Sequence, residues 1–217
     1  MILKVEAVAR PLQDEEGRAL VHHLREGGLL AHPTETVYGL GCILRTQPLG
    51  RLARFKSREE GEAFLLLVPS DERWSGWRDL TWTEPARRLA GAFWPGPLTL
   101  VLRDETGAFP EQVRGGGGGV AVRRTSRSDV AGIVDRLGEP ITSTSANRKG
   151  DPPATDPEAL TRVLEGSEGP WALLDAGPLD ASPPSTLVDC TTDHPRILRT
   201  GAVTKRELEK VVPKIDE

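Results

Sequence analysis

The stretch Gly28-Leu29-Leu30-Ala31-His32-Pro33-Thr34-Glu35-Thr36-Val37-Tyr38-Gly39-Leu40-Gly41-Cys42 joins an apolar run to a polar turn. Its apolar part predicts a short buried strand over residues 29–32, and the chain is expected to bend at the proline that follows. The two glycines near the end lack a Cβ atom, so the backbone there can approach a small polar ligand closely. The threonine and tyrosine hydroxyls of the turn can each donate and accept hydrogen bonds. The stretch therefore predicts either one wall of a ligand pocket or a turn whose threonines cap the backbone.

Strands and helices are expected to alternate on both sides of this stretch. Apolar runs bounded by turn residues predict further strands at residues 2–7, 63–68, 98–102, 120–123, 141–144, 171–175, 186–190 and 196–198. Amphipathic spacing and capping residues predict helices at residues 13–26, 47–57, 84–94, 128–137, 156–164 and 204–212. Strands interleaved with helices argue for an α/β fold with helices on both faces of the sheet. Because only a hairpin fits between the last two strands, we expect an open, twisted sheet of mixed parallel and antiparallel strands, in a single domain over residues 1–217.

The composition is typical of a globular protein. The chain has 217 residues and a formal net charge of −4, with 37% hydrophobic and 28% charged residues. No run approaches the roughly 20 apolar residues that cross a bilayer, and the first residues lack the basic and apolar regions of a secretory signal. The two cysteines, Cys42 and Cys190, have no metal or redox spacing and are interpreted as reduced core thiols. A soluble, cytoplasmic protein without a membrane partner is therefore expected.

The basic residues are clustered although the net charge is negative. Five of them and no acid occupy residues 45–58, and the other groups are Arg123, Arg124 and Arg127, then Arg148 and Lys149, then Arg196 and Arg199. If these groups converge, they form a basic cleft that would suit a nucleotide or RNA. The alternative is that they lie on separate solvated faces.

Two later segments carry groups that suit a phosphate ligand. In Lys56-Ser57-Arg58, at the end of a predicted helix, alternate residues of an extended exit point the same way and can reach one ligand together. An ammonium beside a guanidinium fork suits a polyphosphate, although the helix dipole alone also favours cations at this end. The second segment, Pro140-Ile141-Thr142-Ser143-Thr144-Ser145-Ala146-Asn147, places four consecutive hydroxyls at a strand end. Ligands of open α/β sheets bind outside the carboxyl ends of strands, and the alternative is a set of hydroxyl caps on the backbone.

Together these segments resemble the YrdC/Sua5 family, the threonylcarbamoyl-AMP synthases. The matching motifs are Pro33–Gly41, Lys56-Ser57-Arg58 and Thr144-Ser145-Ala146-Asn147, and further similar pieces are residues 94–100, 120–123, 184–189 and 197–201. Glu35 stands where the family usually has aspartate. Glu59-Glu60-Gly61 follows the lysine–arginine motif where the family commonly has a proline and a more basic loop, and two carboxylates there would weaken the attraction for phosphate. The chain resembles the short form, without the extra C-terminal domain of longer Sua5 proteins.

The resemblance implies an enzyme that makes L-threonylcarbamoyladenylate and pyrophosphate from L-threonine, bicarbonate or CO2, and ATP, with Mg²⁺ as the expected ion. The product would serve a downstream transferase complex that modifies adenosine beside the anticodon of tRNA, and a direct contact with tRNA is left open. The resemblance assigns phosphate binding and catalysis to Lys56, Arg58, Ser145 and Asn147, threonine binding to Thr34, Tyr38, Arg123, Thr142 and Thr144, and nucleotide binding to Arg199 and Gly201. It assigns no metal ligand. It gives His32 no role, because the family usually has an apolar or aromatic residue there.

Three other functions are alternatives. A non-enzymatic RNA-binding protein would use the basic clusters, but only 5% of the residues are aromatic, so platforms for base stacking are few. A carbamoyl-handling protein of the kind found in hydrogenase maturation would normally carry zinc-finger-like cysteines, which this sequence lacks. The third alternative is a diverged relative that has kept the pocket and lost the activity.

Overall fold

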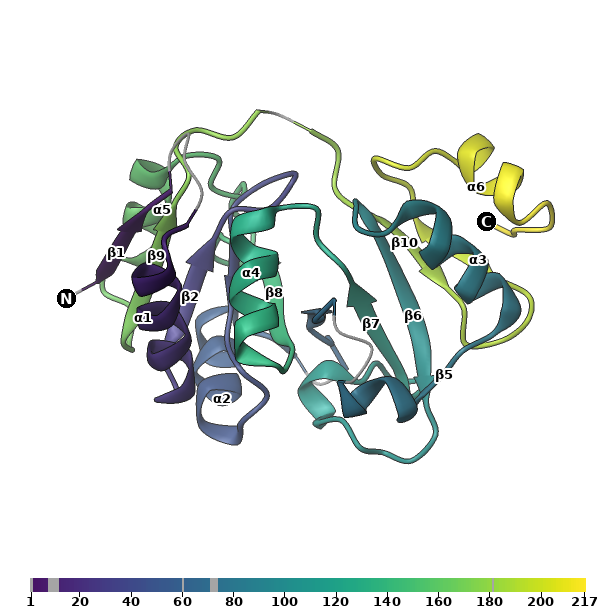
Figure 1. Cartoon of the computed structure of the whole chain (residues 1–217), viewed down its shortest axis with the longest axis horizontal. Helices are drawn as coiled ribbons and strands as arrows, with labels where there is room; N and C mark the ends of the chain where they lie inside the picture. The colour runs from purple at the N-terminus through teal and green to yellow at the C-terminus, as the bar shows by residue number, and fades with distance from the viewer. Residues whose placement is uncertain (1, 8–11, 60, 71–73, 181) are drawn as a thin grey trace.

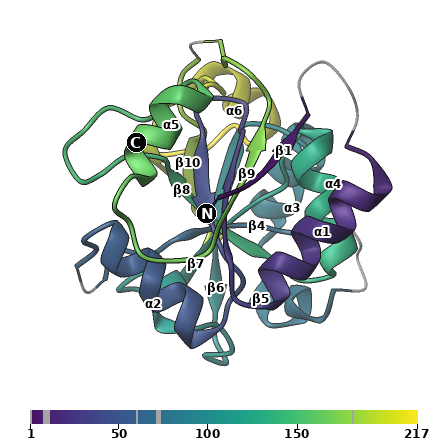
Figure 2. The ribbon, with the colours of Figure 1, turned by 90° about the vertical axis from the view of Figure 1, so that its left-hand side faces the viewer.

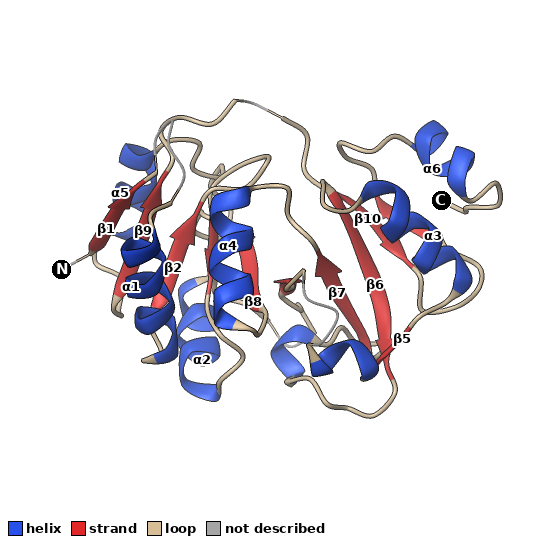
Figure 3. Cartoon of the chain, viewed as in Figure 1, coloured by secondary structure: helices blue, strands red, loops and turns tan. Residues whose placement is uncertain are grey.

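The strands form one long sheet in a computed structural model that describes residues 2–7, 12–59, 61–70, 74–180 and 182–217 (Figure 3). The strands are β1 (Leu3–Glu6), β2 (Leu29–His32), β3 (Gly39–Gly41), β4 (Leu65–Leu67), β5 (Leu80–Thr81), β6 (Leu98–Asp104), β7 (Gly119–Arg123), β8 (Ile141–Ser145), β9 (Trp171–Asp175), β10 (Thr186–Asp189) and β11 (Arg196–Arg199). Their order across the sheet is β1-β9-β2-β3-β8-β4-β7-β6-β10-β11, and β5 pairs with β6 beside this path.

In the described part of the chain, six α-helices connect and cover these strands (Figure 1). They are α1 (Asp14–Arg25), α2 (Thr46–Phe55), α3 (Glu84–Phe93), α4 (Ser128–Leu137), α5 (Pro157–Leu164) and α6 (Lys205–Val211). Two 3₁₀ turns, Ser75–Arg78 and Glu111–Val113, were not expected from the sequence. No described helix combines the length and apolar character that a bilayer crossing requires.

The helix ends follow ordinary capping chemistry. The hydroxyl of Thr83 accepts a hydrogen bond from the first turn of α3, and the carboxylate of Asp156 does the same for α5. Thr204 and Glu207 form a reciprocal capping box at the start of α6. Gly138 ends α4 with a φ of 74°, a left-handed conformation that glycine adopts without strain. These local signals explain why most helices begin and end close to the predicted positions.

The sheet is mixed, as predicted. β9 runs parallel to both β1 and β2, β4 is parallel to β7, and β6 is parallel to β10. The pairs β2–β3, β3–β8, β4–β8, β6–β7 and β10–β11 are antiparallel, and the last of these is the expected hairpin. The prediction of an open mixed sheet with helices on both faces is confirmed, and Figure 2 shows α1 and α4 on one side of the strands with α2 and α5 on the other.

Helices cover the two faces of the sheet unequally. One apolar cluster contains buried residues of α2, α3, α5 and α6 and runs the length of the sheet. The other contains only residues from α1, α4 and the strands around β1, β9, β2, β8 and β4. On the half formed by β7, β6, β10 and β11, this second cluster has no members among the described residues. Side chains that point to this face of that half are therefore free to form a site.

The short strand β3 was not predicted from the sequence. Gly39-Leu40-Gly41 has weak strand propensity, yet it lies between β2 and β8 in the middle of the sheet. A Cβ atom on Gly41 would lie 2.2 Å from the carbonyl oxygen of Thr142 on β8. The glycine thus permits a close approach of two strands, where the sequence had suggested the approach of a ligand.

Candidate functional site

A cavity of about 390 Å³ lies on the uncovered half of the sheet face. Its floor consists of side chains that neighbouring strands direct to the same face, namely Ser143, Leu65, Ala121, Thr99 and Leu187. Its walls come from the loop between β2 and β3, the loop after α2, and the ends of β7, β8, β10 and β11. These lining residues are Thr34, Thr36, Val37, Tyr38, Gly39, Arg58, Ala63, Arg123, Thr144, Ser145, Pro184, Ser185 and Arg199.

The charged residues of this lining are all arginines. Arg58, Arg123 and Arg199 come from three of the four basic clusters in the sequence. The remaining cluster, Arg148 and Lys149, makes other contacts. Lys149 pairs with Glu59 at 2.7 Å, and Arg148 donates to the carbonyl of Glu165. The cavity therefore gathers positive charge in a chain whose net charge is negative, which suits an anionic ligand.

Lys56 holds the end of β8 beside the cavity. Its ammonium donates to the carbonyl oxygens of Ser145 at 2.8 Å and Asn147 at 2.7 Å, and to the Oδ1 atom of Asn147 at 2.6 Å. The hydroxyl of Ser145 donates to the same Oδ1 atom at 2.6 Å, and the amide nitrogen of Asn147 donates to the carbonyl of Asp151. All three N–H groups of the ammonium are thus used, and the loop after β8 is fixed around them.

Burial governs the protonation of the two basic residues after α2. Burial, and to a lesser extent the nearby charge of Arg58, lower the pKa of Lys56 to about 8. Lys56 is still mostly protonated at pH 7. Burial also lowers the pKa of Arg58, whose guanidinium donates to the hydroxyl of Thr144 at 3.1 Å and to the carbonyls of Glu62 and Ala63. The Arg58 guanidinium also lies 4.3 Å over the ring of Phe64, an arrangement that fixes its plane.

The exit from α2 differs from the prediction. Ser57 has a φ of 47°, in the left-handed region, and Lys56 ends the helix in a right-handed conformation. The segment is therefore not extended, and the expectation that Lys56 and Arg58 point the same way because of strand-like alternation is wrong. Both side chains nevertheless reach the end of β8, because the tight turn at Ser57 carries the chain around it.

Glu35 and Arg123 form a buried ion pair at one wall. The side chain of Arg123 is 4% exposed and that of Glu35 is 15% exposed. The same carboxylate accepts hydrogen bonds from the hydroxyl of Thr125 and from the backbone and hydroxyl of Ser126. Burial alone would raise the pKa of Glu35, but the charge of Arg123 and the bonds from Ser126 outweigh it and hold the pKa below its ordinary value. Part of the Arg123 charge is thus already neutralised inside the protein.

The opposite wall is formed by β10 and β11. Arg199 donates through Nε and Nη2 to the carbonyl of Ser185 and through Nη2 to its hydroxyl, and that hydroxyl lies 3.0 Å from the hydroxyl of Thr99. A Cβ atom on Gly201 would lie 2.1 Å from the carbonyl oxygen of Pro184. Gly201 therefore lets the chain after β11 pack against the cavity wall.

The structure brings most of the predicted site residues together. Seven line the cavity, namely Thr34, Tyr38, Arg58, Arg123, Thr144, Ser145 and Arg199. Four do not, namely Lys56, Asn147, Thr142 and Gly201. The first two are joined to the lining through Ser145. Thr142 is fully buried and its hydroxyl accepts from the backbone of Cys42 at 3.0 Å, so its contacts are with the protein.

Two of the lining residues also have structural contacts. The hydroxyl of Tyr38 donates to the carbonyl of Gly177 and accepts from the backbone of Ala176, while burial raises its pKa to about 12. The hydroxyl of Thr34 donates to the carbonyl of Val37 and accepts from two backbone N–H groups in the same turn. The two readings of this stretch, pocket wall and capped turn, are therefore both present in the structure.

Several lining residues were missed. Thr99 and Ser185 received no role, although Thr99 lies in an apolar strand and Ser185 lies beside one. Ser143 was noted only as one of the four hydroxyls at a strand end and received no role of its own. A single hydroxyl residue in a strand such as Leu98-Thr99-Leu100 was an available signal. Which strands lie side by side was not available, because the order of the sheet differs from the order of the sequence.

No metal ligand set is present in the described part of the chain. Nowhere in it do three His, Cys, Asp or Glu side chains gather as a metal site would require. Mg²⁺ commonly keeps few protein ligands and binds substrate phosphates.

Comparison with known proteins agrees with this geometry. The family model Sua5/YciO/YrdC, described as "Telomere recombination", matches residues 22–201. A protein of Bacillus subtilis named threonylcarbamoyl-AMP synthase is 33% identical over 192 residues, which cover 87% of this chain and 54% of that protein. A protein of Thiobacillus denitrificans with the same name is 35% identical over 185 residues, covering 82% of this chain and 91% of its own length. The chain thus spans only about half of the Bacillus protein.

A solved structure gives the same result in three dimensions. The crystal structure of Pyrococcus abyssi Sua5 complexed with L-threonine superposes with a TM-score of 0.86 at 32% identity and covers 100% of this chain and 62% of its own. The predicted family resemblance is confirmed, since the matched residues contain each of the three motifs that carried it. The chain belongs to the Sua5/YciO/YrdC family.

Proposed function

We propose that the chain is a threonylcarbamoyl-AMP synthase, which converts L-threonine, CO2 or bicarbonate, and ATP into L-threonylcarbamoyladenylate and pyrophosphate. One observation carries the proposal: Arg58, Arg123 and Arg199 line one polar cavity together with the hydroxyl-rich end of β8. The names of the similar proteins, and the threonine complex of the Pyrococcus relative, support it.

The charge of the cavity suits the central difficulty of this reaction. A threonine carbamate must attack the α-phosphate of ATP, so two anions must approach each other. Positioning and fixed positive charge are what a protein can most readily contribute to such a transfer. The arginines are held in place by hydrogen bonds to protein oxygens, so little reorganisation is needed when the substrates bind.

The phosphate-binding role is proposed for the residues at the end of β8 and after α2. Arg58 would bind phosphate oxygens directly, because it lines the cavity. Lys56 would contribute its charge and hold Ser145 and Asn147 in position, since its N–H groups are bonded to these two residues. Ser145, which lines the cavity, would exchange its hydrogen bond to Asn147 for one to the phosphates or the carbamate. Asn147, whose side-chain amide donates to Asp151, would hold Ser145 in position.

The threonine-binding role is proposed for Thr34, Tyr38 and Thr144, with Arg123 for the carboxylate. Arg123 would have to share its guanidinium between Glu35 and the substrate. Thr142 is proposed to support the backbone just after β3, because its hydroxyl accepts a hydrogen bond from the backbone of Cys42. Arg199 is proposed to bind the nucleotide, and Gly201 to support it by close packing against Pro184.

Mg²⁺ is proposed to bind with the phosphates of ATP, where it would neutralise charge. The downstream transferase complex, a contact with tRNA and the cytoplasmic location stay predictions from the sequence, as does the single-domain organisation.

Pyrophosphate release tests the proposal. The protein is incubated with ATP, Mg²⁺ and bicarbonate, with and without L-threonine, and pyrophosphate is measured. Release that depends on threonine is expected. An RNA-binding protein without activity would release none, and a carbamoyl-handling enzyme would turn over only with a carbamoyl phosphate substrate.

The aromatic residues also give the RNA-binding alternative little support. The four partly buried tryptophans Trp74, Trp77, Trp82 and Trp94 pack against one another outside the cavity lining, so they offer the cavity no platform for base stacking.

A further inference from the structure

His32, the last residue of β2, is a buried side chain outside the set that the family resemblance assigns. It is fully buried, and its Nδ1 atom lies 3.1 Å from the carbonyl oxygen of Pro33. Its Nε2 atom is buried and has no hydrogen-bond partner among the described residues. Because buried polar atoms are nearly always paired, an unpaired imidazole nitrogen beside a cavity requires an explanation.

Nε2 of His32 and the hydroxyl of Ser143 both lie close to Gly39, although no hydrogen bond joins them in the structure. A Cβ atom built on Gly39 would lie 2.8 Å from Cε1 of His32, 3.1 Å from Nε2 and 3.1 Å from Oγ of Ser143. Nε2 of His32 and Oγ of Ser143 are therefore each 3.1 Å from the same Cβ position, and the distance between the two atoms is at most the sum of these two distances. Any side chain at position 39 would occupy the space between them, so the glycine keeps this path open.

Ser143 connects His32 to the cavity. It lies on β8, pairs with Leu65 of β4, and forms part of the cavity floor. His32 pairs through β2 and β3 with Gly39, and Gly39 pairs with Ser145 of β8. Side chains of paired residues share a face, and so do residues two apart on one strand, such as Ser145 and Ser143. The imidazole and the Ser143 hydroxyl therefore lie on the same side of the sheet. With the Ser143 hydroxyl turned toward Nε2, or with one water molecule between the two atoms, a proton on a ligand in the cavity would reach a buried base.

The surroundings of His32 keep its ring neutral and able to accept a proton at Nε2. Burial lowers the pKa of His32, so the ring is neutral at pH 7 and Nε2 can accept a proton. The carbonyl of Pro33 and the carboxylates of Asp129 on α4 and Glu35 in the β2–β3 loop favour the charged ring, whereas Arg123 at the end of β7 opposes it. These favourable groups offset the burial only in part, so an imidazolium there would form transiently and pass its proton on.

The proposed reaction needs such an acceptor. At neutral pH the amino group of threonine is an ammonium, and its nitrogen has no lone pair with which to attack CO2. The arginines of the lining cannot accept a proton. Lys56 is mostly protonated at pH 7, and the Glu35 carboxylate is bonded to Arg123, Thr125 and Ser126.

We propose that Ser143 and His32 relay the ammonium proton of the amino-acid substrate away from the cavity, an inference that rests on the proposed function. The ammonium N–H bond breaks and its proton passes to Oγ of Ser143, while the Ser143 proton passes to Nε2 of His32. The nitrogen lone pair that is set free forms the bond to the carbon of CO2, and one C–O π bond opens to give the carboxylate. The nitrogen then loses a second proton to solvent water, which gives the carbamate. His32 acts through Ser143 and is a positioning and proton-holding residue. It returns the proton to solvent through Ser143 and the cavity after the reaction.

The forward and reverse reactions distinguish a proton relay through His32 from a purely structural role of this residue. Forward, threonine-dependent pyrophosphate release includes the proton removal. In reverse, ATP formation from threonylcarbamoyl-AMP and pyrophosphate requires only the phosphoryl step. For His32→Gln, which keeps a polar side chain without a basic nitrogen, we expect forward release at pH 7 to fall by about 10- to 100-fold, the lower end of general acid–base effects and below. ATP formation in reverse should stay within about twofold of wild type, since the phosphoryl-transfer residues are untouched.

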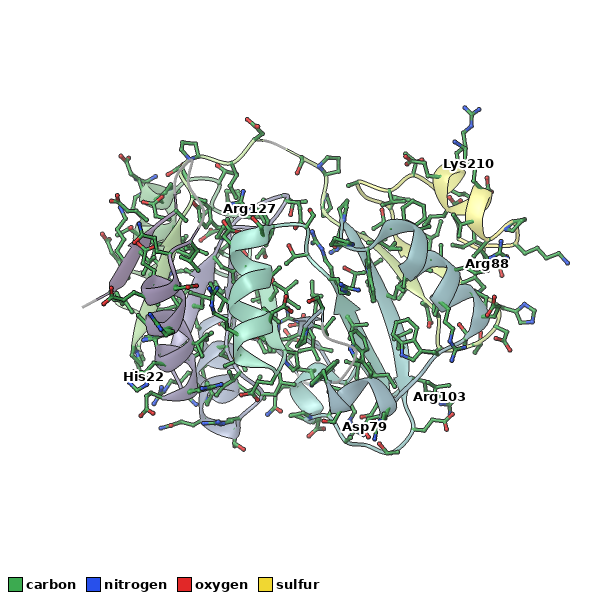
Figure 4. All side chains as sticks on the ribbon, viewed as in Figure 1. His22, Asp79, Arg88, Arg103, Arg127 and Lys210 are labelled. Atoms are coloured by element: carbon green, nitrogen blue, oxygen red, sulfur yellow. The ribbon has the colours of Figure 1, made fainter. Side chains whose placement is uncertain are left out.

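Raised pH gives a second readout. As pH approaches the pKa of the threonine amine, substrate with a free lone pair becomes available without the relay, so the forward deficit of His32→Gln should shrink. Ser143→Ala should show the same pattern. His22→Gln is the matched control, because His22 lies exposed on α1, away from the cavity (Figure 4). If His32→Gln folds poorly, His32→Phe keeps the ring volume and is measured instead.

The outcomes separate the two proposals. An equal fall in both directions would mean that His32 only supports the fold, and an unchanged forward rate would mean that it has no part in proton removal. Either result overturns the relay while leaving the synthase function intact. A wild-type protein without threonine-dependent pyrophosphate release would instead overturn the proposed function, and the relay with it.

Discussion

The Nζ atom of Lys56 lies 2.6 Å from the Oδ1 atom of Asn147, although 91 residues separate them in the chain. This contact joins the end of α2 to the loop after β8 and sets the position of both beside the cavity. Lys56 is buried and surrounded by three oxygen atoms, so its charge is directed into the protein while remaining close to the lining residue Ser145. The phosphate-binding part of the proposed site depends on this arrangement.

Replacing Lys56 is expected to weaken ATP binding. Truncation of one member of a buried charged contact typically costs about 2–5 kcal/mol, because the oxygens of Ser145 and Asn147 lose their shared donor and the cavity loses a positive charge. Lys56→Ala should therefore raise the dissociation constant for ATP, measured by titration calorimetry. Lys210→Ala, an exposed lysine on α6, is the control and should bind ATP as wild type does (Figure 4). Unchanged affinity in Lys56→Ala would rule out its role in phosphate binding.

ATP affinity should depend on pH through the same residue. The pKa of Lys56 lies at about 8 in the free protein, and a bound polyphosphate would favour the charged form. The affinity is therefore expected to be constant below that value and to fall by up to about tenfold per pH unit above it, as the ammonium deprotonates. Calorimetric titrations from pH 7 to pH 9.5 would measure this fall. Lys56→Met should lack it, and an identical pH profile in wild type and variant would contradict the assignment.

The Glu35–Arg123 pair is expected to stabilise the fold. Removing one partner of a buried ion pair costs about 3–5 kcal/mol, because the other charge is left uncompensated. Glu35→Gln should reduce the free energy of unfolding by about this range at pH 7, the lower end being favoured since the amide can still accept from Arg123.

The effect of pH on this stability has a definite sign. The pKa of Glu35 in the folded protein is below its ordinary value, so its contribution is present above the pKa of the unfolded chain and is lost as pH falls through the folded value. Urea unfolding of wild type and Glu35→Gln should therefore converge in strongly acidic buffer. A difference that stayed constant down to the acid limit would contradict the ion pair.

Gly41 is expected to be intolerant of any side chain. A Cβ atom there would lie 2.2 Å from the carbonyl oxygen of Thr142, a backbone atom of the neighbouring strand that cannot move without separating β3 from β8. Gly41→Ala should lower the free energy of unfolding by about 1–3 kcal/mol or more. Gly91→Ala is the matched control, since it lies on the exposed side of α3 with no atom within 4 Å of the added methyl group, and it should leave stability unchanged or raise it. Equal stability of the two variants would contradict the close approach of the strands.

Much of the fold could be predicted because its elements carry local signals. The run Ala63–Val68 contains the buried strand β4, and the capping residues Thr83, Asp156 and Thr204 mark helix starts. β3 could not be predicted, because its two glycines lower strand propensity and its place between β2 and β8 is decided by tertiary packing alone.

The candidate site was predictable where a motif carried it and unpredictable where strand order decided it. The lysine–arginine motif and the hydroxyl-rich strand end were found from the sequence, and the structure brings Lys56, Arg58 and Ser145 together. Thr99 and Ser185 become neighbours only because β6 and β10 pair in parallel, although 86 residues separate them. The contact between Arg123 and Glu35 likewise depends on the tertiary structure. The sequence around either residue therefore could not predict how far Glu35 neutralises the charge of Arg123.

The most direct test follows carbon from bicarbonate into an adenylate. Wild-type protein is incubated with ATP, Mg²⁺, L-threonine and isotopically labelled bicarbonate, and the products are separated and identified by mass spectrometry. A labelled threonylcarbamoyl-AMP that disappears when either threonine or ATP is omitted is the expected result. If ATP binds to the cavity and no labelled adenylate forms, the synthase function is contradicted.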